Sequence, residues 1–214
     1  MMKIFEKFYT RLGLNALVSQ EYGKAERFFL KLRRLNRGAM GTHHNLGMVY
    51  LAMEDFDRAE TCFLDEIENF GPNYSRAKVL GDLYYASRDR EKSLKYYTLA
   101  NGLSAGEPDS PLVKKRLHIC NHEDCFRKAG ISLDLYKKGV EAEGQRDFAR
   151  AKDCYAKACQ MDGTNVLALN NAGACSERRG DLLAAQKYFK QAHELSGLPV
   201  IGENLKKIEK AILR

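Results

Sequence analysis

The sequence predicts an all-α solenoid of antiparallel helix pairs that ends in a capping helix. Aligning the chain of 214 residues against itself gives a repeat of about 34 residues. Within each repeat, apolar residues recur at helical spacing on two segments, as in a helix–turn–helix. The chain has only four Pro and no Trp, which fits long helices with short connections. Together these observations predict stacked helical hairpins.

Five repeats fall into two groups separated by an interruption. Their ranges are 6–39, 40–73 and 74–107, then 132–165 and 166–199. A single hairpin cannot bury its apolar face, so neighbouring repeats have to stack to complete a core.

Small and aromatic residues recur in phase through these repeats. The first segments carry Leu12-Gly13, Leu46-Gly47 and Leu80-Gly81, and then Gly139 and Gly173 without the Leu. The second segments carry a small residue at Ala25, Ala59, Ser93, Ala151 and Ala185. Four residues later comes an aromatic, at Phe29, Phe63, Tyr97, Tyr155 and Phe189. Small residues let helices approach closely, and the aromatic is expected to fill the groove between repeats.

This pattern resembles the tetratricopeptide-repeat family over about 170 residues. The resemblance implies a right-handed superhelix whose concave groove is lined by the first helix of each repeat. The Pro usual near the end of each family repeat is missing here. Gly71, Gly163 and Gly197 are expected to end helices instead, through left-handed C-caps.

The last segment, 200–214, predicts a capping helix. Its apolar residues follow one stripe among charged residues, which suits the end of a solenoid. The stripe consists of Ile201, Leu205, Ile208 and Ile212.

Residues 108–131 interrupt the repeat. Pro111 is expected in the first turn of a helix capped by Ser110 or Asp109, which runs to about Lys128, before Gly130. This segment either caps the first three repeats, with a hinge near Gly130, or packs as a degenerate repeat in one continuous superhelix. We favour the continuous arrangement, in which all five repeats share one groove.

Composition favours a soluble globular protein, with 44% hydrophobic and 29% charged residues. No apolar run approaches the roughly 20 residues of a spanning helix. Lys3, Glu6 and Lys7 would interrupt the apolar region of a signal peptide, so the expected location is cytoplasmic.

The net charge of +7 is uneven along the chain. Residues 1–107 hold 16 Lys and Arg against 14 Asp and Glu, whereas residues 108–214 hold 19 against 14. This favours an acidic partner for the second half. A nucleic-acid-binding protein would show a denser basic stripe with interleaved aromatics. The short cluster Lys31, Arg33, Arg34 and Arg37 is expected to be a solvated helix face.

No catalytic motif is present, and one cluster suggests metal chemistry. His118, His122 and Cys125 share a face if the helix is continuous, while Cys120 points inward. Three such ligands could hold zinc, but structural zinc sites draw ligand pairs from two segments, and no second pair is visible. We therefore predict no metal or other cofactor. The other cysteines, Cys62, Cys154, Cys159 and Cys175, lie in helical patterns and are expected to be reduced and packed.

The predicted partner-binding groove follows from the family phase. Its residues are Arg11, His44, Asn45, Met48, Lys78, Asp82, Tyr85, Tyr136, Lys137, Asn170 and Asn171. Asn45 and Asn171 share the phase at which peptide-binding family members carry Asn, whose amide both donates and accepts. The carboxylate clamp of chaperone-binding members does not transfer, because only these Asn residues match it.

The sequence therefore predicts a non-enzymatic scaffold that binds a segment of another protein, acidic by the charge argument, in this groove. The alternative is a metal- or redox-responsive regulator that uses His118, His122 and Cys125. Self-association stays open, since an exposed solenoid end can stack on its copy.

Overall fold

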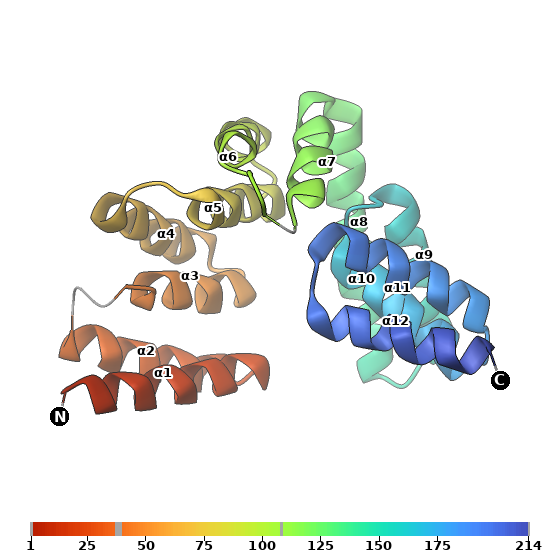
Figure 1. The fold of residues 1–214 in the computed structure, drawn as a ribbon. Coiled ribbons are helices and arrows are strands. Elements are labelled where there is room, and N and C mark those ends of the chain that lie inside the picture. The colour runs from red at the N-terminus through yellow and green to blue at the C-terminus, as the bar shows by residue number, and fades with distance from the viewer. Residues whose placement is uncertain (1, 37–39, 108, 214) are drawn as a thin grey trace. The chain divides into compact units, whose positions relative to one another are not determined.

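The computed structural model describes residues 2–36, 40–107 and 109–213, and these form twelve α-helices and no strand (Figure 1). The predicted all-α fold of paired helices is confirmed. The chain divides into two compact units, residues 1–103 and 104–214. Within the described residues, no helix is long and apolar enough to cross a membrane.

The first unit contains three antiparallel helix pairs that stack in chain order from the N-terminus (Figure 1). They are α1 (Met2–Val18) with α2 (Tyr22–Leu35), α3 (Thr42–Ala52) with α4 (Phe56–Phe70), and α5 (Tyr74–Ala86) with α6 (Arg90–Gly102). Each pair falls in one of the first three predicted repeats, except that α1 begins before residue 6.

The second unit contains the other six helices. They are α7 (Ser110–Asn121), α8 (Glu123–Gly144), α9 (Phe148–Met161), α10 (Val166–Arg178), α11 (Leu182–Ser196) and α12 (Pro199–Ile212). α8 pairs with α9 and α10 with α11. α12 packs on α11 through Ile201, Leu205 and Ile208, so it caps this unit as predicted, although Ile212 is exposed.

The interruption at 108–131 differs from its prediction. Pro111 lies in the first turn of α7 as expected, but α7 ends at Asn121 and α8 runs without a break through Gly130. Glu123 and Asp124 lie in the first turn of α8, where acidic side chains favour a helix start. α7 belongs to the second unit, where it contacts α8 and α11.

A common turn joins the two helices of every repeat. The residue before each N-cap has positive φ, and the list is Gln20, Glu54, Arg88, Arg146 and Gly180. In the last four turns an Asp follows and accepts a hydrogen bond from the backbone N–H three residues later, at 3.0 to 3.1 Å. This bond satisfies a free N–H at the helix start and so fixes where the second helix begins.

Glycine ends two of the three helices for which it was predicted to do so. Gly197 is a left-handed C-cap of α11, as expected, and Gly71 ends α4 with a positive φ of 73°. Gly163 has no such role, because the chain leaves α9 at Asp162, whose side chain accepts hydrogen bonds from the N–H and hydroxyl of Thr164.

The recurring aromatic residue packs against the glycine on the first helix of its own repeat. A Cβ added at Gly13 would lie 2.6 Å from the Phe29 ring, and one at Gly47 would lie 2.5 Å from the Phe63 ring. The same contact occurs at Gly81, Gly139 and Gly173. The sequence pattern placed the aromatic between repeats and did not anticipate this contact, in which the missing Cβ admits the ring directly onto the partner helix.

Contacts between successive repeats of the first unit use a polar group that recurs after 34 residues. The Tyr50 hydroxyl donates to Glu26 at 2.9 Å, and Arg58 donates to the same carboxylate at 3.0 Å. In the next repeat Tyr84 and Lys92 donate to Glu60 in the same way. Arg58 and Lys92 also lie over the rings of Tyr50 and Tyr84 of their own repeats, and the shared bonds to Glu26 and Glu60 tie the second and third repeats to the one before each.

The cysteines are free thiols, as predicted. Cys62, Cys120 and Cys175 are buried, whereas Cys154 and Cys159 are half-buried. Burial raises the pKa of Cys62 to about 11 and that of Cys159 to about 12.

We expect Gly47→Ala to destabilise the first unit by about 1 to 3 kcal/mol, because the new Cβ overlaps the Phe63 ring. The matched control is Gly23→Ala in α2, where a Cβ meets nothing within 4 Å and should stabilise the helix by about 0.5 to 1 kcal/mol. Urea unfolding followed by circular dichroism measures both. Equal stability of the two variants would contradict the packing described here.

We expect Cys62 and Cys159 to react with iodoacetamide at pH 8 at least about a hundredfold more slowly in the folded protein than in urea, since the thiolate is the nucleophile. The pKa of each thiol is higher in the folded protein than in the unfolded chain, where it is about 9. As pH rises above about 9, these thiols therefore ionise more readily in the unfolded chain, which lowers the free energy of unfolding. Peptide mapping by mass spectrometry gives the rates. Equal rates in buffer and urea would refute the burial of these thiols.

Candidate functional site

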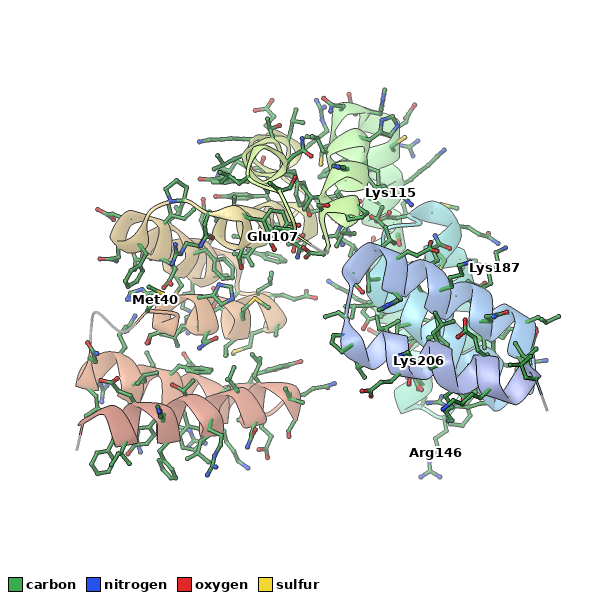
Figure 2. The ribbon with its side chains drawn as sticks, in the orientation of Figure 1. Met40, Glu107, Lys115, Arg146, Lys187 and Lys206 are labelled. Carbon is green, nitrogen blue, oxygen red and sulfur yellow. The ribbon has the colours of Figure 1, made fainter. Side chains whose placement is uncertain are left out.

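A hollow of about 480 Å³ lies between α1 and α3 in the first unit. Its lining comprises Glu6, Lys7, Thr10, Arg11, Leu14, Asn15, Leu32, Met40, Thr42 and Asn45. Most of these residues are on the first helices of two repeats, where the family phase places the groove. Met40, labelled in Figure 2, lies just before α3.

The α1 side of the hollow carries unneutralised positive charge. Lys7 and Arg11 are one helical turn apart, and neither forms an ion pair with any described residue. Glu6 also lines the hollow, where its carboxylate accepts a hydrogen bond from the Asn36 amide at 3.0 Å and keeps its negative charge, so the two cations exceed the acidic lining by one. The surface facing the hollow therefore attracts an anionic group.

The α3 side supplies neutral polar groups one turn apart. Thr42 is 1% exposed, and its hydroxyl has no hydrogen-bond partner among the described residues. A buried polar atom without a partner is costly, so this hydroxyl is a local weak point of the packing beside the hollow. The Asn45 amide, half-buried, likewise has no hydrogen bond to a described residue. Leu14, Leu32 and Met40 add apolar surface, so the hollow combines charge, amide and apolar contact.

A buried carboxylate fixes the start of α3 beside the hollow. Glu66 of α4 accepts from the backbone N–H of Gly41 at 3.0 Å and from that of His44 at 3.4 Å. Arg76 lies 3.8 Å from the same carboxylate and also donates to two backbone oxygens at the end of α4. These contacts satisfy free N–H groups at the N-terminus of α3 and hold Thr42 and Asn45 in place.

The other predicted groove residues of the first unit are largely engaged within the fold. His44 packs its ring against Phe63, and burial lowers its pKa, so it is neutral at pH 7. Met48 packs against the core. Lys78 and Asp82 form an ion pair of 3.0 Å, and Asp82 also accepts from the Tyr97 hydroxyl at 2.6 Å.

Tyr85 is the clearest departure from the predicted groove. It is 3% exposed and its ring packs edge-on against Tyr97, so it cannot offer that ring to a partner. Repeat phase placed it on the groove side of α5, but the neighbouring aromatic covers it.

In the second unit the predicted residues lie beside a polar network. The Asn171 amide interacts with the Tyr155 hydroxyl, which donates to Glu143 at 3.0 Å, and Arg178 donates to that carboxylate at 2.7 Å. Burial raises the pKa of Tyr155, and the Arg178 hydrogen bond lowers that of Glu143. The Asn170 amide donates to Asn171 at 3.4 Å. Tyr136 packs on Tyr155, and Lys137 is exposed.

The predicted metal candidates do not gather into a ligand set. The break between α7 and α8 falls at His122, so His118, His122 and Cys125 do not share one continuous helix. The rings of His118 and His122 lie 4.6 Å apart. Within the described ranges, no group of three His, Cys, Asp or Glu side chains could hold a metal ion. Cys120 is fully buried, as the inward orientation predicted.

Besides Arg11 and Asn45, first-helix phase also selects Lys7, Thr10 and Leu14 of the hollow. The lining residues that sequence reasoning missed are Glu6, Asn15, Leu32, Met40 and Thr42. Leu32 belongs to a second helix, and Met40 precedes α3, so first-helix phase does not select them. The signal that could have found Thr42 is its place three residues before Asn45, on the same face of one helix.

Comparison with known proteins agrees with this architecture. A family model described as tetratricopeptide repeat matches residues 42–69, which span α3 and most of α4. Anaphase-promoting complex subunit 3 of Schizosaccharomyces pombe is 28% identical over 148 residues, which cover 69% of this chain and 22% of that protein. The chain thus spans less than a quarter of that relative.

Among solved structures, PilF of Pseudomonas aeruginosa superposes with a TM-score of 0.51 at 14% identity, covering 98% of this chain and 86% of that one. MamA of Desulfovibrio magneticus gives a TM-score of 0.46 at 15% identity, covering 91% and 97%. At 14% identity, the match to PilF shows a similar fold and nothing beyond it.

We expect Glu66→Gln to destabilise the first unit by about 1 to 3 kcal/mol. The neutral amide has one acceptor oxygen for two backbone N–H groups, and it no longer attracts the guanidinium of Arg76. The matched control is Glu68→Gln on the exposed side of α4, which should change stability by less than about 0.5 kcal/mol. Thermal unfolding measures both. A Glu66→Gln protein as stable as the Glu68→Gln control would show that the carboxylate does not cap α3.

Proposed function

We propose that the chain, whose residues 42–69 match a tetratricopeptide-repeat model, is a non-enzymatic scaffold that binds a segment of another protein between α1 and α3. The observation that carries this proposal is the hollow of the first unit, where Lys7 and Arg11 face Thr42 and Asn45 over apolar surface.

The chemistry of the lining indicates what the segment contains. Two cations without acidic partners favour a carboxylate, and the Asn45 amide can pair with a peptide group that needs both a donor and an acceptor. Leu14 and Met40 are exposed and add adaptable apolar contact. The partner segment is therefore acidic and carries at least one apolar side chain.

The support from the polar residues differs between the two units. Asn45 has no partner among the described residues, whereas the equivalent Asn171 interacts with Tyr155. We therefore propose Arg11 and Asn45 as the principal binding residues. The other predicted groove residues contribute less to binding in this proposal, because most of them already form contacts within the fold. Tyr85 is buried and contributes through the packing of the core. A relative named as a subunit of a protein complex is in keeping with a scaffold role.

We expect the double variant Arg11→Ala, Asn45→Ala to lose capture of its partner from native lysate by about tenfold, because it removes the charge and the amide of the hollow. The matched control is Lys157→Ala, Gln160→Ala, which removes one cation and one amide from the exposed side of α9. Quantitative mass spectrometry compares each variant with the wild type. A partner retained equally by wild type and groove variant would place binding on another surface.

A further inference from the structure

The outer face of α2 carries a basic stripe. Lys24, Arg27, Lys31 and Arg34 recur at spacings of three and four, which places them on one side of the helix, and all four are exposed. They lie opposite the buried stripe of α2, which is Ala25, Phe29 and Leu32.

The charge of this stripe is barely compensated. Glu21 pairs with Lys24 at 2.5 Å, but Arg27, Lys31 and Arg34 have no carboxylate partner among the described residues. Arg27 donates to the Gly23 carbonyl at 3.2 Å, and Lys31 lies 5.8 Å from the centre of the Tyr9 ring. Three adjacent cations without counter-charges give the face a positive potential.

Two hollows with apolar lining border the same cations. One, of about 380 Å³, includes Phe28 and Leu30 of α2; the other, of about 340 Å³, includes Phe5 and Tyr9 of α1 and Leu35 of α2. Both hollows are lined by Lys31 and Arg34. The sequence pattern indicated a solvated helix face at Lys31 and Arg34, and the structure adds an apolar surface beside it.

This face is separate from the groove between α1 and α3. The two hollows share no lining residue with the groove. At about 100° per residue, Phe5 and Tyr9 lie on the opposite side of α1 from Lys7 and Leu14. One ligand segment in the groove would leave the outer face of α2 free.

The shape of the face selects among anionic partners. A membrane surface is met by apolar side chains that protrude beyond the cations. Phe5 and Leu35 are 49% and 44% exposed, but both line the hollow beside Lys31 and Arg34, which leaves room for an apolar side chain of a partner between them. Nucleic-acid bases need open ring faces for stacking, but Tyr9 and Phe28 pack against each other with ring centres 6.3 Å apart. Hollows beside cations suit a peptide whose large apolar side chains enter them while its carboxylates meet Arg27, Lys31 and Arg34.

We propose that the outer face of α2, with Phe5 and Tyr9, is a second binding surface for an acidic segment of another protein that carries large apolar side chains. The scaffold then holds two partner segments at once, one in the groove and one on this face.

The test selects a displayed library of random short peptides on four immobilised full-length proteins. They are the wild type, the stripe variant Arg27→Glu, Lys31→Glu, Arg34→Glu, the groove variant Arg11→Ala, Asn45→Ala, and the control Lys187→Glu, Lys190→Glu, Lys206→Glu. The control reverses three exposed charges in the second unit, and Figure 2 labels Lys187 and Lys206. Circular dichroism verifies that each variant is folded.

We expect the peptides enriched by the groove variant to be rich in Asp, Glu and large apolar residues, to bind the wild type and the control equally well, and to bind the stripe variant at least about tenfold more weakly. Phe5→Ala should weaken the same peptides by about threefold, which a purely electrostatic attraction would not show.

Three outcomes overturn the proposal. Equal weakening in the control means non-specific charge attraction. Loss of all acidic peptides in the groove variant means that only the groove binds, which leaves the proposed function intact. In the third outcome no peptide is enriched, the wild type binds phosphatidylserine vesicles or single-stranded DNA, and the stripe variant does not. The face then recognises a membrane or nucleic acid.

Discussion

The contact between a helical glycine and an aromatic ring holds each helix pair together, and the rest of the structure depends on it. At Gly13, Gly47, Gly81, Gly139 and Gly173 the ring of the second helix occupies the space that a Cβ would take. The two helices can therefore approach closely along their length, and each hairpin presents a continuous apolar side to its neighbour. The Glu26 and Glu60 networks then join successive hairpins of the first unit through Tyr and basic side chains.

Polar groups at helix starts determine which surfaces are left for binding. Glu66 is used at the N-terminus of α3, where it satisfies two backbone N–H groups and holds Thr42 and Asn45 beside α1. The carboxylate of Asp82 likewise accepts hydrogen bonds from Tyr97 and Lys78, and the amide of Asn171 interacts with Tyr155. Residues committed to such internal bonds have less to offer a ligand, since a new bond would have to replace an existing one. The binding surfaces proposed for the first unit therefore lie where cations and amides lack internal partners.

The two basic surfaces of the first unit have the same two features. Lys7 and Arg11 on α1, and Arg27, Lys31 and Arg34 on α2, are exposed cations without carboxylate partners among the described residues, and both sets border apolar hollows. Overall net charge pointed to the second half of the chain, yet the hollows beside unpaired cations described above are in the first. Net charge counts residues, whereas the local potential depends on which of them are already neutralised.

The sequence alone determined the repeat length, the helix pairs, the capping helix and the recurrence in phase of Gly and an aromatic residue, because helical periodicity and repeated small residues are local properties of the chain. It also predicted Arg11 and Asn45 for the proposed groove. Only the tertiary structure decided that Tyr85 is covered by Tyr97, that each aromatic ring packs on the glycine of its own repeat, and that the helix breaks at His122 rather than before Gly130. The reason is that repeat phase assigns a residue to a helix face, whereas burial and pairing depend on what a distant segment such as Glu66 or Tyr97 places against that face.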